Sequence, residues 1–346
     1  MASLKSVNIG GVTIGGGAPV AVQSMLSVKT SDVKASVEQI CRLRDLGCKI
    51  FRVAVPDLAA AEAIAEIKKK TGAPIVADIH FDYRLALAAL KAGADKIRIN
   101  PGNLPRERVP IVAAACKERG APIRVGANGG SLSKELLAKY GGVTAEALVD
   151  SALENIKILN DCDFDDICVS LKASSAPLTV AACRLFAKAA PYPLHIGVTE
   201  AGTEQGGVIK SAVGIGSLLL DGIGDTVRVS LTAPPEKEVT AAYRILAAAG
   251  LYTPPVEIIS CPACGRTRID IVSIANELEE RLRGVNKHIK VAVMGCAVNG
   301  PGEARDADIG IAGGDGDALL FKKGAPVRKI GEKDIIPVLL EEIDKL

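Results

Sequence analysis

Three cysteines in the last quarter of the chain have the type and spacing of metal ligands. Cys261 and Cys264 form a C-x-x-C pair within CPACGRT, and Cys296 follows within MGCAVNGPGEA. The pair places two thiolates on one tight turn, and the third arrives on a separate glycine-rich loop. Soft sulfur ligands suit an iron–sulfur cluster or zinc. No fourth cysteine follows in the sequence, which indicates an open or oxygen-ligated position on a metal that acts on substrate.

Other uses of these cysteines are weaker interpretations. A redox C-x-x-C would leave Cys296 without a role, and His195 and His288 lack the spacing of zinc partners. The other six of the nine cysteines stand singly in apolar patterns, where a small buried hydrophobe is the expected role.

A second group of candidate residues is basic and lies in short β-branched runs: Arg52, Arg98, Arg124, Lys172 and Arg228. A single such charge is explained by a salt bridge to a neighbouring carboxylate, because an unpaired buried charge is costly. Five together, with few acidic neighbours, favour an anionic ligand. Guanidinium groups match phosphate oxygens in bidentate fashion, so we expect a diphosphate. Polar residues close to these runs complete the predicted substrate site: His80, Asn100, Asn128 and Ser230.

The remaining titratable candidates have competing interpretations. His80 stands between Asp78 and Asp82, so a structural His–Asp bond competes with a substrate contact. His195 lies early in its run, where a satisfied core histidine is expected. Glu200 follows the same run and is predicted either to transfer protons or to pair with an arginine.

The elements that must position these residues alternate between strand and helix. Eight short strand-like runs begin at Val20, Ile50, Pro74, Lys96, Pro122, Asp166, Pro193 and Thr226. Helical patterns separate them, among them Ser31–Leu46, Leu58–Lys70 and Glu236–Ala249, and several end at a glycine. Eight such units predict a (β/α)8 TIM barrel, whose reactive residues stand at the C-terminal ends of its strands. An open doubly wound sheet is the competing fold, and the first twenty residues predict a hairpin that closes the barrel bottom.

The pattern changes after a linker candidate at Thr253-Pro254-Pro255. We therefore expect a barrel domain over residues 1–252 and a metal-binding α+β domain over residues 253–346. The second domain is predicted to contain strand Val256–Ser260, helix Asp270–Arg283, strand Lys290–Met294, two short strands and a final helix Lys333–Lys345.

Composition sets the broad class. The 346 residues are 48% hydrophobic but only 3% aromatic, which is typical of parallel strands under Ala-rich helices. A net charge of +2 suggests neither nucleic acid nor a membrane surface as a partner. No apolar run approaches the roughly 18 residues of a membrane span, and the N-terminus lacks the apolar core of a signal peptide. These features predict a cytoplasmic protein.

Five motifs together resemble one enzyme family. IRINPGN, RVGANGGSL, HIGVTEAG, CPACGRT and MGCAVNGPGEA are similar to those of 4-hydroxy-3-methylbut-2-enyl diphosphate synthases of the non-mevalonate isoprenoid pathway. The resemblance runs from about Val22 to Glu303 and implies the short, two-domain bacterial form. It also implies a [4Fe–4S] cluster held by Cys261, Cys264, Cys296 and Glu303, with one iron that contacts substrate. The residues alone could not choose Glu303 over Asp306 or Asp308.

The resemblance also implies a reaction and a donor. The expected activity is the reductive ring opening and dehydration of 2-C-methyl-D-erythritol 2,4-cyclodiphosphate, with electrons from reduced flavodoxin or ferredoxin. Two other classes stay open at this point. One is a pterin-binding-like barrel transferase with a structural zinc domain, and the other is an electron-carrier module.

We further expect a homodimer whose active site is shared between chains. The helix after the last barrel strand runs back to the barrel bottom, so the second domain begins at the end opposite the active site. A barrel about 30 Å tall, the length of a ~20-residue helix, lies between them. A short Pro-rich linker cannot span that distance, whereas a head-to-tail partner can cap the mouth, and the resemblance implies the same arrangement.

Overall fold

The computed structural model describes residues 3–99, 104–296 and 305–346. The chain divides into two compact units, Met1–Tyr252 and Thr253–Leu346, called here the barrel unit and the small unit. Within the described ranges, no helix is both long enough and apolar enough to cross a membrane.

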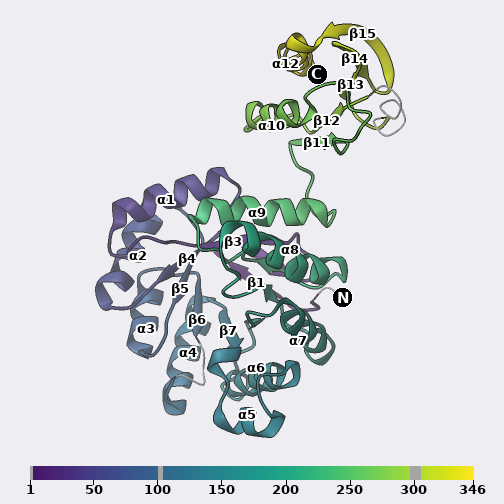
Figure 1. Ribbon diagram of the computed structural model, residues 1–346. Helices are drawn as coiled ribbons and strands as arrows, with labels where there is room; N and C mark the ends of the chain where they lie inside the picture. Colours follow the sequence, from purple (N-terminus) through teal and green to yellow (C-terminus); the bar gives the residue numbers. More distant parts are fainter. Residues whose placement is uncertain (1–2, 100–103, 297–304) are drawn as a thin grey trace. The chain divides into compact units, whose positions relative to one another are not determined.

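Eight parallel strands form the centre of the barrel unit (Figure 1). They are β3 (Ala21–Met25), β4 (Ile50–Ala54), β5 (Ile75–Asp78), β6 (Lys96–Ile99), β7 (Ile123–Asn128), β8 (Ile167–Lys172), β9 (His195–Ile196) and β10 (Thr226–Val227). They pair in the order β8-β7-β6-β5-β4-β3-β10-β9. A parallel bridge from Val169 to Leu194 then joins the two ends of that order. The (β/α)8 prediction is confirmed, and the doubly wound sheet is excluded.

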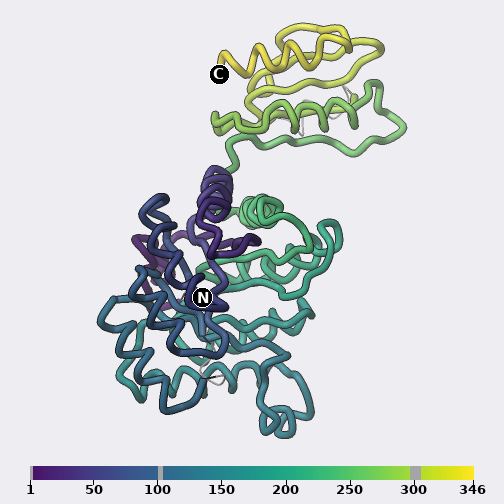
Figure 2. The backbone as a smooth tube through the Cα atoms, turned by 90° about the vertical axis from the view of Figure 1, so that its left-hand side faces the viewer, coloured from purple at the N-terminus to yellow at the C-terminus, as the bar shows by residue number. Residues whose placement is uncertain are grey.

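Helices surround the strands, as both views show (Figures 1 and 2). They are α1 (Val33–Asp45), α2 (Leu58–Thr71), α3 (Tyr83–Lys91), α4 (Val109–Arg119), α5 (Lys134–Tyr140), α6 (Ala145–Asn160), α7 (Ala176–Ala189), α8 (Glu204–Leu220) and α9 (Pro235–Ala248). The hairpin of β1 (Ser6–Ile9) and β2 (Val12–Gly15) precedes β3, and its Ile9 and Ile14 pack with Ala21, as expected for a barrel floor.

Local sequence sets the helix boundaries. Asp32 and Asp57 accept hydrogen bonds from backbone N–H groups in the first turns of α1 and α2, which satisfies donors that have no partner inside a helix. Gly72 and Gly120 end α2 and α4 in the left-handed conformation, where a residue without Cβ is favoured. The prediction that several helices end at a glycine is confirmed at these two positions.

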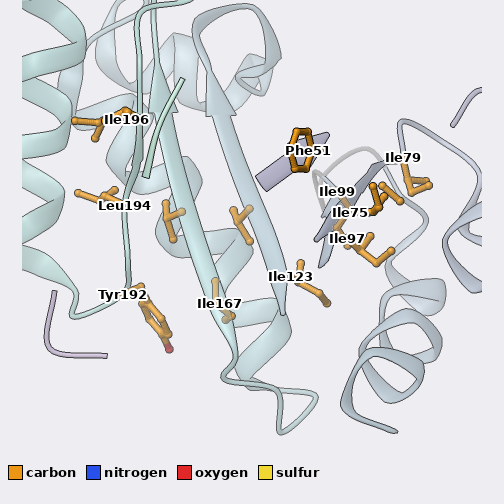
Figure 3. Packing of buried hydrophobic residues seen from close by; sticks show 14 of the residues in the cluster. Phe51, Ile75, Ile79, Ile97, Ile99, Ile123, Ile167, Tyr192, Leu194 and Ile196 are labelled. Atoms are coloured by element: carbon orange, nitrogen blue, oxygen red, sulfur yellow. The ribbon is translucent and has the colours of Figure 1, made fainter. Parts of the chain in front are cut away.

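Side chains alternate between the two faces of each strand. The outward positions are aliphatic and pack in one core with the helices, and Figure 3 shows Leu194 and Ile196 pointing from their strand toward a helix. The intervening positions face the barrel interior. Several of these are polar or charged, so the barrel centre is a layer of hydrogen-bonding groups above a small apolar floor.

The small unit is an α+β fold with its own core. Its sheet has the order β11-β12-β13-β14-β15, with bounds Val256–Ser260, Ile289–Met294, Ile309–Gly313, Asp317–Lys322 and Ala325–Gly331. Helices α10 (Ile271–Arg281) and α12 (Ile335–Asp344) pack with one another and with this sheet.

The prediction of two short strands before the final helix is wrong, because three are present. Strand β15 is exposed at every position except Ile330 and therefore carries no alternating pattern. It pairs with β14 through Lys323 and Gly324, both of which have positive φ, as a tight two-residue hairpin turn requires.

The core of the small unit can be tested on one helix. Leu278 of α10 is fully buried, so Leu278→Ala should lower the free energy of unfolding of the small unit by about 2–5 kcal/mol through lost burial and a residual cavity. Val272 lies on the same helix and is 58% exposed, so Val272→Ala is the matched control and should have little effect. Urea unfolding monitored by circular dichroism measures both; equal losses would contradict the assigned core.

Candidate active site and metal centre

The barrel interior holds an excess of positive charge. Six basic side chains face it from five strands or from the residues directly after them: Arg52, Lys96, Arg98, Arg124, Lys172 and Arg228. Among the described residues, the carboxylates paired with these cations are Asp78 and Glu238. The predicted cluster of basic residues at the barrel mouth is therefore present, and few acidic groups balance it.

Asp78, at the end of β5, connects two of the arginines. It is 1% exposed; its Oδ2 accepts from Arg52 Nη2 at 2.6 Å and its Oδ1 accepts from Arg98 Nη1 at 3.2 Å. Burial by itself raises the pKa of this carboxyl, but Arg52 and Arg98 outweigh that effect and hold the pKa below its ordinary value. Asp78 is therefore a charged anchor that fixes both guanidinium groups.

Arg228 lies directly after β10 and is held from the other side of the barrel. Its Nη1 donates to Ser230 Oγ at 2.6 Å, and its Nη2 donates to Glu238 Oε1 at 3.2 Å. Glu238 belongs to α9 and also accepts from the backbone N–H of Leu231. Ser230 was predicted as a substrate contact; its hydroxyl accepts a hydrogen bond from Arg228, so it also orients that guanidinium.

Several buried N–H groups in this interior have no acceptor among the described residues. They are Nε of Arg52, Arg98 and Arg228, and both Nε and Nη1 of Arg124. Arg124 is 2% exposed, and burial together with Arg52 and Arg98 lowers its pKa. Burying a donor without an acceptor costs free energy. An anion in the barrel would supply the missing acceptors.

Two glycines leave room for the basic groups. A Cβ on Gly126 would lie 3.5 Å from Arg98 Nη2 and 3.3 Å from Ser170 Oγ. A Cβ on Gly197 would lie 3.0 Å from Lys172 Nζ and only 2.3 Å from the carbonyl oxygen of Arg228. The ends of Arg98 and Lys172 therefore lie over strand positions that carry no side chain.

The histidines differ from expectation. His80 Nε2 is 3.7 Å from Asp78 Oδ2, too long for a hydrogen bond, so the structural His–Asp bond is absent. His195 is fully buried, as expected for a core histidine, and its Nδ1 is 2.6 Å from Thr226 Oγ1. However, its Nε2 has no partner among the described residues, so it is only half satisfied.

Glu200, Asn128 and Asn100 complete the predicted barrel residues. Glu200 is exposed, pairs with none of the described arginines, and has a φ of 51°, an unusual conformation for a non-glycine residue. Asn128 ends β7 and is half-buried. Asn100 lies outside the described residues. Sequence reasoning missed Lys96 and Glu238 as members of this site; the two-residue period of a strand places Lys96 on the same face as Arg98 and could have revealed it.

In the small unit, two candidate metal ligands stand at the ends of neighbouring strands. Cys261 follows β11 and Cys296 lies two residues after β12, and these strands pair in parallel. Cys261 Sγ accepts from the backbone N–H of Gly295 at 3.2 Å. Backbone N–H groups directed at sulfur are typical around iron–sulfur clusters. A Cβ on Gly295 would lie 2.9 Å from the Thr267 side chain, so the two loops pack closely here.

Cys264 is exposed, and hydrogen bonds from Arg266 lower the pKa of its thiol, which favours the thiolate that metals bind. Among the described residues, no three His, Cys, Asp or Glu side chains lie close enough to share one metal ion. In a [4Fe–4S] cluster each thiolate binds a different iron, so its ligands stand farther apart than those of a single ion. The donor set fits such a cluster. Glu303 lies outside the described residues.

Together these features define a TIM-barrel enzyme for an anionic substrate, with a second unit that carries grouped thiols. A family model described as the GcpE TIM-barrel domain matches residues 4–243, and one described as the GcpE protein C-terminal domain matches residues 257–345. The chain belongs to the GcpE family.

Curated relatives share nearly the full length of the chain. A protein of Ruminiclostridium cellulolyticum is 54% identical over 343 residues, covering 99% of this chain and 97% of the relative. A protein of Geobacter sulfurreducens is 54% identical over 346 residues, covering 100% and 98%. Both are named 4-hydroxy-3-methylbut-2-en-1-yl diphosphate synthase (flavodoxin). The resemblance identified from the motifs is confirmed.

Solved structures show the same barrel fold at low identity. The dihydropteroate synthase of Stenotrophomonas maltophilia with active-site-bound imidazole has a TM-score of 0.51 and 14% identity, covering 70% of this chain and 96% of that chain. The Yersinia pestis dihydropteroate synthase has a TM-score of 0.50 and 12% identity, covering 71% and 97%. This likeness concerns the fold alone, and the full-length relatives do not favour the pterin-binding transferase alternative.

The role of Asp78 as an anchor can be tested by removing its charge. Asp78→Asn leaves two partly buried guanidinium groups without their carboxylate, so we expect a loss of about 3–5 kcal/mol in the free energy of unfolding. Because the pKa of Asp78 is lowered in the folded chain, its stabilisation is present at neutral pH and is lost as pH falls through the folded pKa.

Urea unfolding at pH 7 and at pH 3, which is below the ordinary carboxyl pKa of 3.8, measures both effects. The variant should be less stable than the wild type at pH 7 and should lose less stability on acidification. Asp163→Asn is the control, since Asp163 is exposed and pairs with Lys117 at the surface. Equal stability of Asp78→Asn and the wild type at pH 7 would contradict the anchor.

Proposed function

We propose that this chain catalyses the reductive ring opening and dehydration of 2-C-methyl-D-erythritol 2,4-cyclodiphosphate to 4-hydroxy-3-methylbut-2-enyl diphosphate. It is an oxidoreductase of the non-mevalonate isoprenoid pathway, like the relatives that share its full length. The reaction consumes two electrons and two protons, opens the ring at a carbon–oxygen bond and releases one water.

The observation that carries the substrate assignment is the set of buried guanidinium N–H groups without acceptors. A cyclic diphosphate has two phosphate groups with oxygens in several directions, so it can accept from arginines on opposite sides of a barrel. We assign Arg52, Arg98, Arg124, Lys172 and Arg228 to its phosphates. His80, Asn100, Asn128 and Ser230 complete the substrate site, and the barrel provides orientation and charge neutralisation.

Glu200 is proposed as the group that transfers protons. It is exposed in the loop that follows β9, four residues after the strand ends at Ile196, and its backbone has a left-handed conformation. Such conformations persist where the surrounding structure enforces them, and they concentrate at functional sites.

The cofactor is proposed to be a [4Fe–4S] cluster with Cys261, Cys264, Cys296 and Glu303 as ligands. The adjacent strand ends support Cys261 and Cys296, and the Gly295 N–H donor supports Cys261. The lowered pKa of its thiol supports Cys264, and the family resemblance supports Glu303. When bound, the cluster supplies the two electrons one at a time. Reduced flavodoxin is the proposed donor, as the names of the relatives state, with ferredoxin as the second candidate.

We also propose a homodimer whose active site is shared between chains. Tyr243 of α9 donates to the carbonyl oxygen of Gly47, which precedes β4, so α9 ends at the floor of the barrel. Tyr252, the last residue of the barrel unit, packs its ring on Tyr243, so the chain leaves that unit near its floor. A two-fold partner can bring a second small unit to the barrel mouth.

The cluster assignment predicts that the cluster and turnover can be lost while the barrel stays folded. Cys261→Ser, Cys264→Ser or Cys296→Ser should prevent stable cluster assembly and abolish turnover while the barrel remains folded, because the two units have separate cores. Iron and acid-labile sulfide content after anaerobic purification measures this, with circular dichroism for folding. Cys41→Ser, at an exposed cysteine elsewhere, is the control. A variant with its full iron and sulfide would remove that residue from the ligand set.

The shared site predicts complementation between two inactive chains. Arg124→Ala should bind substrate weakly and Cys296→Ser should lack the cluster, so each homodimer is inactive. In a heterodimer, one of the two shared sites combines an intact barrel with an intact small unit, and we expect up to about half the activity of the wild type. Differently tagged chains purified through both tags provide the sample. A verified heterodimer without activity would indicate that each chain completes its own site.

A further inference from the structure

Lys96 is a buried cation for which the proposed reaction has no use. It lies on β6 two residues before Arg98, and its side chain is fully buried. Its hydrogen bond among the described residues is a long contact of 3.5 Å from Nζ to Gln23 Oε1. No carboxylate of the described residues forms an ion pair with it. A buried lysine is rarely left in this condition.

The groups around Lys96 come from the other strands of the barrel. They are Gln23 of β3, Arg52 of β4, Arg124 of β7, Cys168 of β8 and His195 of β9. Asp78, Lys172 and Arg228 face the same barrel interior from β5, from β8 and from directly after β10. Most of the charged members are cations. Asp78 is already held by Arg52 and Arg98. Burial raises the pKa of the Cys168 thiol and lowers that of His195, so both are neutral at pH 7.

Buried polar nitrogens without a hydrogen-bond partner accompany Lys96 in the barrel interior. Gln23 Nε2, His195 Nε2 and two nitrogens of Arg124 have no hydrogen-bond partner among the described residues. The interior near the barrel mouth therefore suits a ligand with negative charge or hydrogen-bond acceptors. Lys96 lies closer to the barrel floor than Arg98, because it precedes Arg98 along β6.

We propose that Lys96 is a positioning residue for the anionic substrate, which acts beside Arg52 and Arg124 and, where its amine is neutral, takes up a proton when the anion enters the barrel. The inference rests on the proposed function, because it requires a diphosphate in the barrel mouth. The step is a simple protonation: the neutral amine of Lys96 accepts a proton from solvent and becomes an ammonium.

Electrostatics gives the reason. Burial, followed by the positive charges of Arg124 and Arg52, lowers the pKa of Lys96 to about 8. An anion bound to those two arginines offsets their repulsion and so raises the pKa of Lys96. In the protein without substrate, Lys96 has a pKa of about 8, so about a tenth of its amine is neutral at pH 7 and most of it is neutral at pH 9. Substrate binding should therefore add about a tenth of a proton to Lys96 at pH 7 and most of a proton at pH 9. The cyclic diphosphate has no group that titrates in this range, because each of its phosphates bears a single, strongly acidic hydroxyl.

The test is calorimetric titration of the complete protein with 2-C-methyl-D-erythritol 2,4-cyclodiphosphate, without reductant, at pH 7 and pH 9. Buffers of different ionisation enthalpy give the number of protons taken up. Lys172 also has a lowered pKa and contributes its own uptake, so the readout is the difference between the wild type and Lys96→Met. Lys157→Met is the matched control, because Lys157 is an exposed lysine paired with Asp161 on α6.

The expected result is a smaller uptake in Lys96→Met than in the wild type at pH 9, by most of a proton, with little difference at pH 7 and none in the control. Equal uptake by the wild type and Lys96→Met would overturn the role of Lys96 and leave the proposed function intact. Failure of the wild type to bind the cyclic diphosphate would overturn the proposed function itself.

If Lys96→Met fails to fold, Lys96→Arg tests the same inference. Lys96→Arg keeps a positive charge at both pH values, so it should bind the substrate with the same reduced uptake as expected for Lys96→Met. Binding by Lys96→Arg with the uptake of the wild type would overturn the inference.

Discussion

The imbalance of charge inside the barrel is the constraint on which the rest of the structure depends. Six basic groups face this interior, and among the described residues only three of them, Arg52, Arg98 and Arg228, have an ion pair, with Asp78 or Glu238. The fold tolerates this because the outward faces of the same strands make a continuous aliphatic core with the helices. The outward face of each strand thus stabilises the fold. The inward face can therefore hold basic side chains whose burial lowers stability when no anion is bound.

The carboxylates of Asp78 and Glu238 orient the arginine side chains as well as neutralise part of their charge. Asp78 holds Arg52 and Arg98 from one side, and Glu238 holds Arg228 from a helix outside the barrel. Each pair uses some of the N–H groups of its arginine and leaves Nε without an acceptor. The guanidinium planes are therefore fixed before a ligand arrives, which reduces the entropy that binding would otherwise cost.

Much of this arrangement could be predicted from the sequence, for identifiable reasons. The repeating strand and helix patterns are strong signals, so all eight barrel strands and the helices of the small unit were predicted. Strand β15 was missed because its exposed residues do not alternate, although Lys323-Gly324 is a hairpin signal. Glu238 was missed because its contact with Arg228 requires α9 to fold back on the strand. Lys96 was overlooked because an isolated lysine is normally exposed, and only its register with Arg98 places it inside.

The separate cores of the two units have a consequence for the cell. Oxidants attack solvent-accessible iron–sulfur centres, and Cys264 is exposed. On the proposed cluster assignment, a chain that has lost its cluster would keep a folded barrel, because none of the barrel core comes from the small unit. With the substrate site proposed in the barrel, such a chain would still bind the cyclic diphosphate but could not convert it. On that assignment, replacing the cluster would require no refolding of the barrel, because the two cores are separate.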